Sequence, residues 1–173
     1  IDAGARNDLY WWMTNIRQRP GPDGSVQNGL HEVFKTYKDF MVNVPLSNGN
    51  YRSLDPVVSD GTSVRVLGQK DTVNRRAHAW VQNRKHIWCA VVGGVANCPY
   101  TWDNSRLSGT LTISGFVPGT AYAAQWFYFD STGNVTQPAS ATATADGNGS
   151  IILNLDTLPV TVTDAAVKIG SYP

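Results

Sequence analysis

Residues that could carry out a reaction are few and scattered in this sequence. Glu32 is the only glutamate, and most of the aspartates stand in turn contexts that capping and Asx-turns explain. Glycoside hydrolysis generally needs two carboxyl groups held across the scissile bond, and no such pair is marked out here. The histidines, His31, His78 and His86, come without a GxSxG motif, a P-loop or a dinucleotide fingerprint. We therefore assign no catalytic residue and expect no catalysis by this chain alone.

Tryptophan is the residue type that points to a ligand. In RRAHAWVQ (75–82), strand alternation puts Ala77, Ala79 and Val81 on an apolar face and Arg76, His78, Trp80 and Gln82 on a polar one. If NRK (83–85) forms a tight hairpin, Trp88 lies on the neighbouring strand. Two indoles beside His78 and Gln82 resemble a platform for sugar rings. Because large aromatics also dominate cores and interfaces, we expect Trp80 and Trp88 to be covered, with sugar stacking as the alternative.

Two further segments offer aromatic side chains. In AYAAQWFYFD (121–130), alternation places Tyr122, Trp126 and Tyr128 on one face. Trp102 lies in PYTWDNSR (99–106), which is predicted to be a loop, and loops often carry recognition residues. Trp126, Tyr128 and Trp102 are therefore candidate carbohydrate contacts as well.

Cysteine spacing favours a disulfide over a metal or redox site. Cys89 and Cys98 would close a short loop, which suits an oxidising, secreted or extracellular setting, although two free thiols fit the same spacing. No CxxC motif or histidine pair with zinc-ligand spacing is present. Calcium is an alternative at DSTGN (130–134) and DGNGS (146–150), which we interpret as hairpin turns. We predict no metal ion and no cofactor.

Composition excludes other partner classes. The formal net charge is +1, with 14 basic and 13 acidic side chains, so no strong field attracts nucleic acid or anionic lipid. No apolar run approaches the length of a membrane-spanning helix. We therefore expect neither a nucleic acid nor a membrane as partner.

The elements that must position these residues change in character along the chain. Residues 26–44 repeat apolar side chains at three- and four-residue steps, which predicts a helix ending before Pro45. An aromatic run (8–16) and a Pro- and Gly-containing loop (19–25) precede it. From residue 46 onward, about eight short strands separated by turns predict a mainly β fold, an antiparallel β-sandwich of the Ig or carbohydrate-binding-module type. The predicted strands are 64–68, 75–82, 86–92, 109–114, 121–130, 139–145, 150–155 and 165–170.

The predicted organisation is thus a strand-loop-helix segment (1–45) docked on a sandwich (46–173). The order of LYWWMTN, HEVFKTYKDFMVNVP, AHAWVQNRKHIW, GTLTISGFVPGTAYAAQWFYFDSTGNV and LPVTVTDAAVKIG resembles the C-terminal region of multidomain, clan-A, cellulase-like glycoside hydrolases. In that family a (β/α)₈ barrel precedes a small β-sandwich. The resemblance implies that 8–16 and 26–44 correspond to the last barrel strand and helix, and that Trp11 or Trp12 contacts sugar. The family's catalytic glutamates lie on earlier strands that this chain lacks.

These observations favour a non-catalytic β-sandwich module of a secreted polysaccharide-degrading glycoside hydrolase. Its partners would be a polysaccharide or oligosaccharide, or the catalytic domain of the same parent enzyme, which it would brace. One alternative is an autonomous carbohydrate-binding module using Trp80, Trp88, Trp102 or Trp126. The others are an Ig-like adhesion or structural domain without a sugar site, and a hydrolase that works through aspartates.

Overall fold

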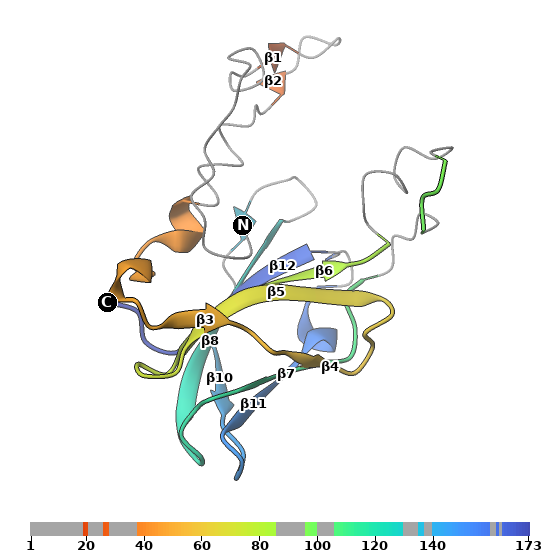
Figure 1. Cartoon of the computed structure of the whole chain (residues 1–173). Coiled ribbons are helices and arrows are strands. Elements are labelled where there is room, and N and C mark those ends of the chain that lie inside the picture. Colours follow the sequence, from red (N-terminus) through yellow and green to blue (C-terminus); the bar gives the residue numbers. More distant parts are fainter. Residues whose placement is uncertain are drawn as a thin grey trace.

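Two antiparallel sheets packed face to face form the body of the protein (Figure 1), as predicted from the sequence. The computed structural model describes residues 19–20, 26–27, 38–85, 96–99, 106–129, 135–136, 140–159, 162 and 164–173. No helix among these residues is long and apolar enough to cross a membrane.

The large sheet has seven strands in the order β10-β8-β12-β6-β5-β3, with β9 paired to β8. Its central strands, β12 and β6, are the two in which buried side chains are most frequent. The strands are β3 (Tyr51–Ser53), β5 (Val64–Asp71), β6 (Arg76–Asn83), β8 (Ala121–Phe129), β9 (Val135–Thr136), β10 (Ala141–Thr144) and β12 (Asp164–Ile169).

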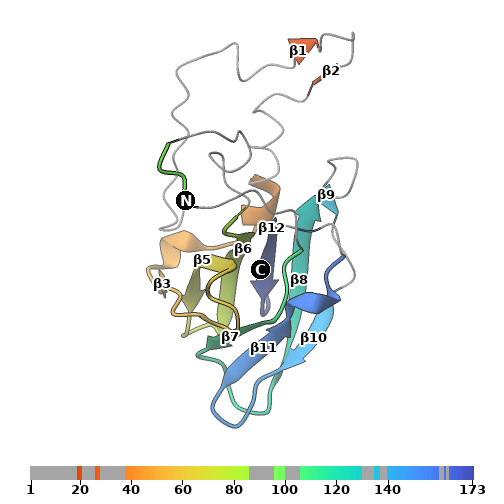
Figure 2. The same ribbon diagram turned by 90° about the vertical axis from the view of Figure 1, so that its right-hand side faces the viewer.

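The small sheet has three strands in the order β11-β7-β4, which are β4 (Val57–Val58), β7 (Thr110–Ser114) and β11 (Ser150–Asn154). Figure 2 shows it covering one face of the large sheet. Short 3-10 turns, η1 (Leu46–Asn48) and η2 (Leu155–Thr157), precede β3 and follow β11.

Two neighbouring connections carry the chain from one sheet to the other. The turn between β10 and β11 was predicted as a hairpin at 146–149, and this is wrong, because the two strands belong to different sheets. It lies beside the β7–β8 connection, where Gly115 and Phe116 donate from their backbone N–H groups to the Gly149 carbonyl. A side chain at Gly149 would meet the Phe116 carbonyl, so this close contact requires glycine.

The predicted helix at 26–44 is only partly correct. Val26 and Gln27 form strand β2 (Val26–Gln27), which pairs with β1 (Arg19–Pro20) inside the predicted loop. Residues 38–41 are helical. The helix ends at Met41 rather than at residue 44, because Asn43 takes the left-handed conformation (φ 64°) and Val44 donates to the Met41 carbonyl. Residues 28–37 and the run 8–16 lie outside the described residues.

Most other predicted strands are present, and those at 64–68 and 75–82 correspond to β5 and β6. The prediction at 86–92 falls outside the described residues. Strands β3, β4 and β9 are additional to the predicted ones. Such short strands carry too few residues for alternation to be recognised.

The core lies between the two sheets. The inward face of β6, with Ala77, Ala79 and Val81, is fully buried, as its alternation predicted. Across from it, the inward side chains of β7 and β11 include Leu111, Ile113, Ile151 and Leu153.

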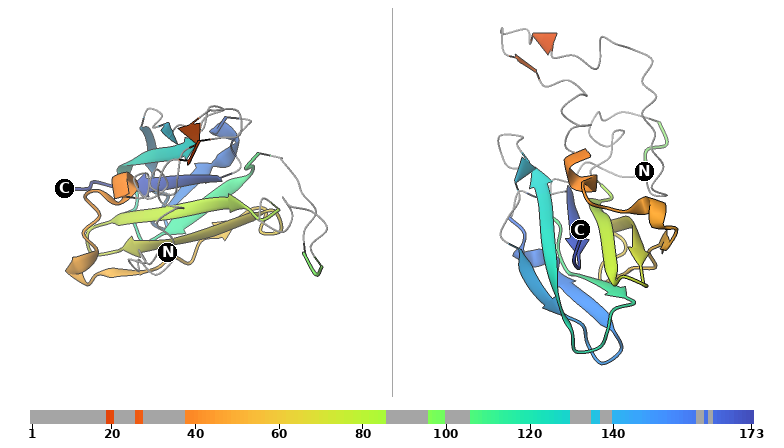
Figure 3. Two further views of the ribbon diagram at one scale, coloured as in Figure 1. Left: turned by 90° about the horizontal axis from the view of Figure 1, so that it is seen from above. Right: turned by 90° about the vertical axis from the view of Figure 1, so that its left-hand side faces the viewer.

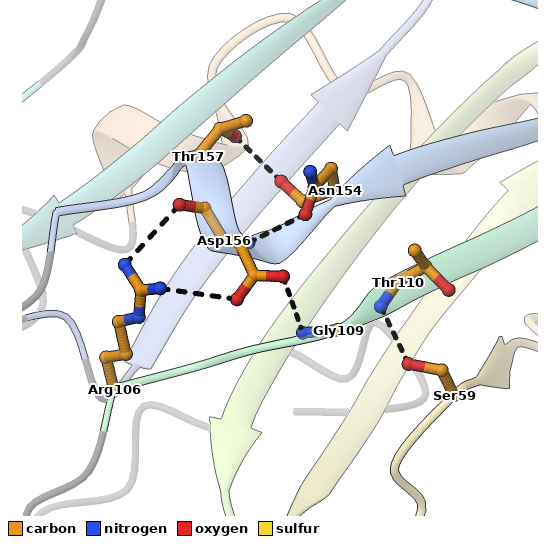
Figure 4. Close-up of polar contacts among 7 residues, drawn as sticks. All are labelled: Ser59, Arg106, Gly109, Thr110, Asn154, Asp156 and Thr157. Carbon is orange, nitrogen blue, oxygen red and sulfur yellow. Dashed lines mark hydrogen bonds and ion pairs between the residues drawn. The ribbon is translucent and has the colours of Figure 1, made fainter.

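Polar contacts join η2, the start of β7 and the residue after β4 at one end of the small sheet (Figure 4). The Asp156 carboxylate of η2 lies 3.5 Å from the Arg106 guanidinium and accepts a bond from the Gly109 N–H group. Across the sheet, Ser59 Oγ accepts from the Thr110 N–H group at 2.8 Å. These contacts are exposed, so they define where β7 begins more than they stabilise the fold.

Adjacent isoleucines on β11 allow a matched test of this core. Ile151 is 0% exposed and Ile152 is 56% exposed. We expect Ile151→Ala to lower the free energy of unfolding by about 2–5 kcal/mol, since it leaves a cavity. Ile152→Ala should cost about 1 kcal/mol or less. Urea unfolding measures both, and equal losses would contradict the assignment of faces.

Candidate functional site

The outer face of the large sheet, the face turned away from the small sheet, carries the residues with chemical potential. Strand register fixes this grouping, because His78 lies opposite Gln69 of β5 and opposite Lys168 of β12, and Lys168 lies opposite Gln125 of β8. Two positions further along the strands, Asp71 lies between Arg76 and Tyr51. The register thus builds one polar band across five strands, from β3 at one edge to β8.

Much of this polar band is buried, which is unusual for the outer face of a sandwich. His78 and Lys168 are each 7% exposed, and Gln69, Asp71 and Tyr51 are buried as well. Charged side chains are almost never fully buried unless they have partners. The part of the face around His78, Lys168 and Asp71 is therefore covered, and the residues that cover it indicate what this part of the face does.

Lys168 contacts the end of the short helix directly. Its ammonium donates to the Val42 carbonyl at 2.9 Å, across 126 positions of sequence. The same nitrogen lies 5.3–5.5 Å from the ring centres of Phe40, Phe127 and Tyr172. A carbonyl at a helix C-terminus and the faces of aromatic rings both attract a cation. Burial nevertheless lowers the pKa of Lys168.

His78 is packed among aromatic rings in the same band. The ring centres of Tyr51 and Phe40 lie 5.3 Å and 6.3 Å from that of the imidazole. Burial first, and then the neighbouring Lys168 cation, lower the pKa of His78 to about 4. The imidazole is therefore neutral at neutral pH. Its role as a sugar contact, predicted from the sequence, conflicts with this burial.

Asp71 holds the chain segment that follows the helix against β5 by hydrogen bonds. Its carboxylate accepts hydrogen bonds from the side chain of Asn48 (2.9 Å) and from the N–H group and side chain of Asn74 (2.9 and 2.7 Å). Burial acts to raise the pKa of Asp71, but these bonds outweigh it, and the pKa lies below its ordinary value. Asn48 belongs to η1, so this contact ties the linker after the helix to β5.

Tyr172 completes the covering of this face near the C-terminus. Its hydroxyl donates to the Ala77 carbonyl at 2.6 Å, and its ring lies 5.8 Å from the Arg76 guanidinium carbon. Burial, followed by the influence of Tyr51, raises the pKa of Tyr172 well above its ordinary value.

The predicted carbohydrate contacts separate into three groups: those on the outer face, those in the core and those outside the described residues. Trp80 is 40% exposed on the outer face, which corrects the expectation that it is covered, and the Arg65 guanidinium carbon lies 5.9 Å from its ring centre. Gln82 is half-buried on the same face. Trp126 is only 6% exposed and belongs to the core, against which Tyr128 also packs. The face holding Trp126 is the inner one, so that indole is unavailable to a sugar ring.

The remaining candidates cannot be placed. Trp11, Trp12, Trp88, Trp102 and Cys89 lie outside the described residues. Cys98 is disulfide-bonded. Within the described part of the chain, no group of three or more histidine, cysteine or acidic residues is arranged to hold a metal ion.

Sequence reasoning missed the residues that matter most on this face, namely Phe40, Asp71, Lys168 and Tyr172. A signal was present for Lys168. In DAAVKI (164–169), alternation groups it with Asp164 and Ala166 on one strand face, and a lysine within a run of apolar residues indicates a special environment. Asp71 and Tyr172 carry no comparable signal.

Comparison with known proteins adds no family assignment. No model of a known protein family matches this chain, and no curated protein shows a significant similarity to it.

Two aspartates test the anchoring role of Asp71. Asp71 and Asp60 each accept several hydrogen bonds, but Asp60 receives its bonds from Thr62 and Ser63 within an exposed turn. We expect Asp71→Ala to lower the free energy of unfolding by about 2–4 kcal/mol at pH 7, because it removes a buried, charged acceptor of the part-buried hydrogen bonds from Asn48 and Asn74. Asp60→Ala should cost clearly less. Denaturant unfolding of both variants measures this, and similar losses would contradict the anchoring role.

Proposed function

We propose that this chain is a non-catalytic β-sandwich module whose large sheet braces the segment that precedes it. The observation that carries the proposal is the contact between the Lys168 ammonium and the Val42 carbonyl on a covered outer face. A sandwich whose outer face met a glycan would leave its polar side chains accessible, whereas here Gln69, His78 and Lys168 are buried.

The physical basis of the bracing is a combination of ring packing and charge. Phe40 places its ring 5.2 Å from that of Phe127, edge to face, and 6.3 Å from that of His78. The Lys168 ammonium lies beside both phenyl rings. Residues 38–44 therefore present one aromatic ring and one carbonyl to complementary groups on β6, β8 and β12. Figure 3 shows this helix end lying against the large sheet.

The class of parent protein comes from the resemblance in sequence. In the cellulase-like glycoside hydrolases the last helix of the catalytic barrel leads into a C-terminal sandwich. We propose that this module belongs to a secreted enzyme that degrades polysaccharides, and that it stabilises the end of the catalytic domain. The docking of residues 38–44 supports this, since they are the segment that leads into the sandwich.

Hydrogen–deuterium exchange on the whole chain tests the bracing. We expect the amides of residues 38–46 to be protected in the wild type. Phe40→Ala should raise their exchange rate at least tenfold and also raise that of β12, since it removes the packed ring. Val42→Ala is the matched control, because the Val42 side chain is 47% exposed and its carbonyl is kept. Rapid exchange of 38–46 in the wild type would contradict the proposal.

Carbohydrate binding is a second candidate, favoured by one observation, the exposed indole of Trp80 beside Arg65. A planar ring with a polar neighbour is the combination on which a sugar ring can stack. Within the described residues, however, no second exposed indole accompanies it.

Affinity electrophoresis in gels containing cellulose derivatives, xylan, mannan or β-glucan separates the two candidates. Bracing alone predicts no retardation in any gel. Retardation that is lost in Trp80→Ala and kept in Trp80→Phe, which preserves a ring, would establish sugar binding at this position instead.

A further inference from the structure

Two basic side chains occupy opposite positions on neighbouring strands of the covered face. His78 and Lys168 form a direct cross-strand pair in the β6–β12 register. Side chains of such a pair have Cβ atoms about 5 Å apart. Both are buried to the same extent. Like charges at this separation repel each other, and more strongly in a site from which water is excluded.

Among the described residues, the groups that surround His78 include no free acidic partner for its protonated form. The groups that face it are Gln69 on β5, Tyr51 on β3, Lys168 on β12 and Phe40 of the helix end, and Arg76 precedes it on β6. The nearest carboxylate in the band, that of Asp71, already accepts bonds from Asn48 and Asn74. Within the described part of the chain, His78 Nδ1 has no hydrogen-bond partner. An imidazolium here would add a second buried cation without an acceptor for its new proton.

We infer that protonation of His78 releases residues 38–44 from the large sheet, so that the bracing contact is lost at acidic pH. This inference rests on the proposed bracing function. The docked arrangement excludes water from His78 and holds the Lys168 cation beside it. Undocking lets water reach both groups. A proton that binds the undocked state more tightly must shift the equilibrium toward that state.

The direction and the pH range follow from the same site. Burial, and then Lys168, lower the pKa of His78 to about 4 in the docked state, while an exposed histidine titrates near 6.5. The free-energy difference that favours the docked over the undocked state is therefore fully present above about pH 6.5, and it decreases as the pH falls toward 4. The pKa of Asp71 lies below its ordinary value, so its contacts begin to lose their stabilising effect only as the pH falls through that ordinary value of about 3.9, at the lower end of the range for His78.

Hydrogen–deuterium exchange of the whole chain at pH 7.5, 5.5 and 4.0, corrected for intrinsic exchange rates, tests the inference. Protection of residues 38–46 should fall by on the order of a hundredfold between the extremes, because one proton shifts the equilibrium up to tenfold per pH unit. His78→Gln, which stays neutral, should show nearly constant protection. An equal fall in wild type and His78→Gln would overturn the inference, as would full protection of the wild type at pH 4.0. Free exchange of the wild type at pH 7.5 would instead refute the bracing itself.

A titration of the wild type gives an independent readout that does not depend on the variant. The NMR signal of the His78 ring should titrate well below pH 6.5, and the amide signals of Met41 and Val42 should shift in the same range. An ordinary titration near 6.5, or amide signals that do not follow it, would overturn the inference.

Discussion

A buried ammonium group imposes the main constraint on this structure. Removing a lysine side chain from water is costly unless acceptors replace the water. Lys168 finds them in the Val42 carbonyl and in three aromatic rings that surround its nitrogen. One of those rings and the carbonyl come from the segment before the sandwich. The charge therefore has a suitable environment only while that segment is docked. Burying Lys168 lowers the stability of the sandwich alone, and its contacts with the segment favour the docked state.

The sandwich architecture brings these groups together. Strand β12 is central in the large sheet and pairs with β6 and β8, so Lys168 lies opposite His78 on one side and opposite Gln125 on the other. The inner face of the same strands is closed by the small sheet, where Ile151 and Leu111 are fully buried. Because the core fixes the register of β6 and β12, a one-residue slip would turn Lys168 into the core and Val167 outward. The packing of the inner face thus fixes which side chains lie on the outer face.

The sequence predicted the sandwich because alternation is a local property. The inward set Ala77, Ala79 and Val81 is a clear example, and β6 follows it. Pairing between distant strands is not local, so the cross-sheet turn at 146–149 was mistaken for a hairpin. The same limit affects the site. Alternation placed Trp80 on the outer face correctly, but it assigned Trp126 to a face without indicating that this face is the core. The contact between Val42 and Lys168 spans 126 positions and leaves no pattern in the sequence.

The most direct test of the docking is a double-mutant cycle between Phe40 and Lys168, with Phe40→Ala, Lys168→Met and the double variant compared by denaturant unfolding. The cycle isolates the coupling between the two side chains from the separate cost of burying the ammonium. If the helix end and the sheet hold each other in place through these groups, the coupling energy should be about 0.5–2 kcal/mol. Strictly additive effects would show that Phe40 and Lys168 act independently, and would contradict the account of the large sheet as a brace.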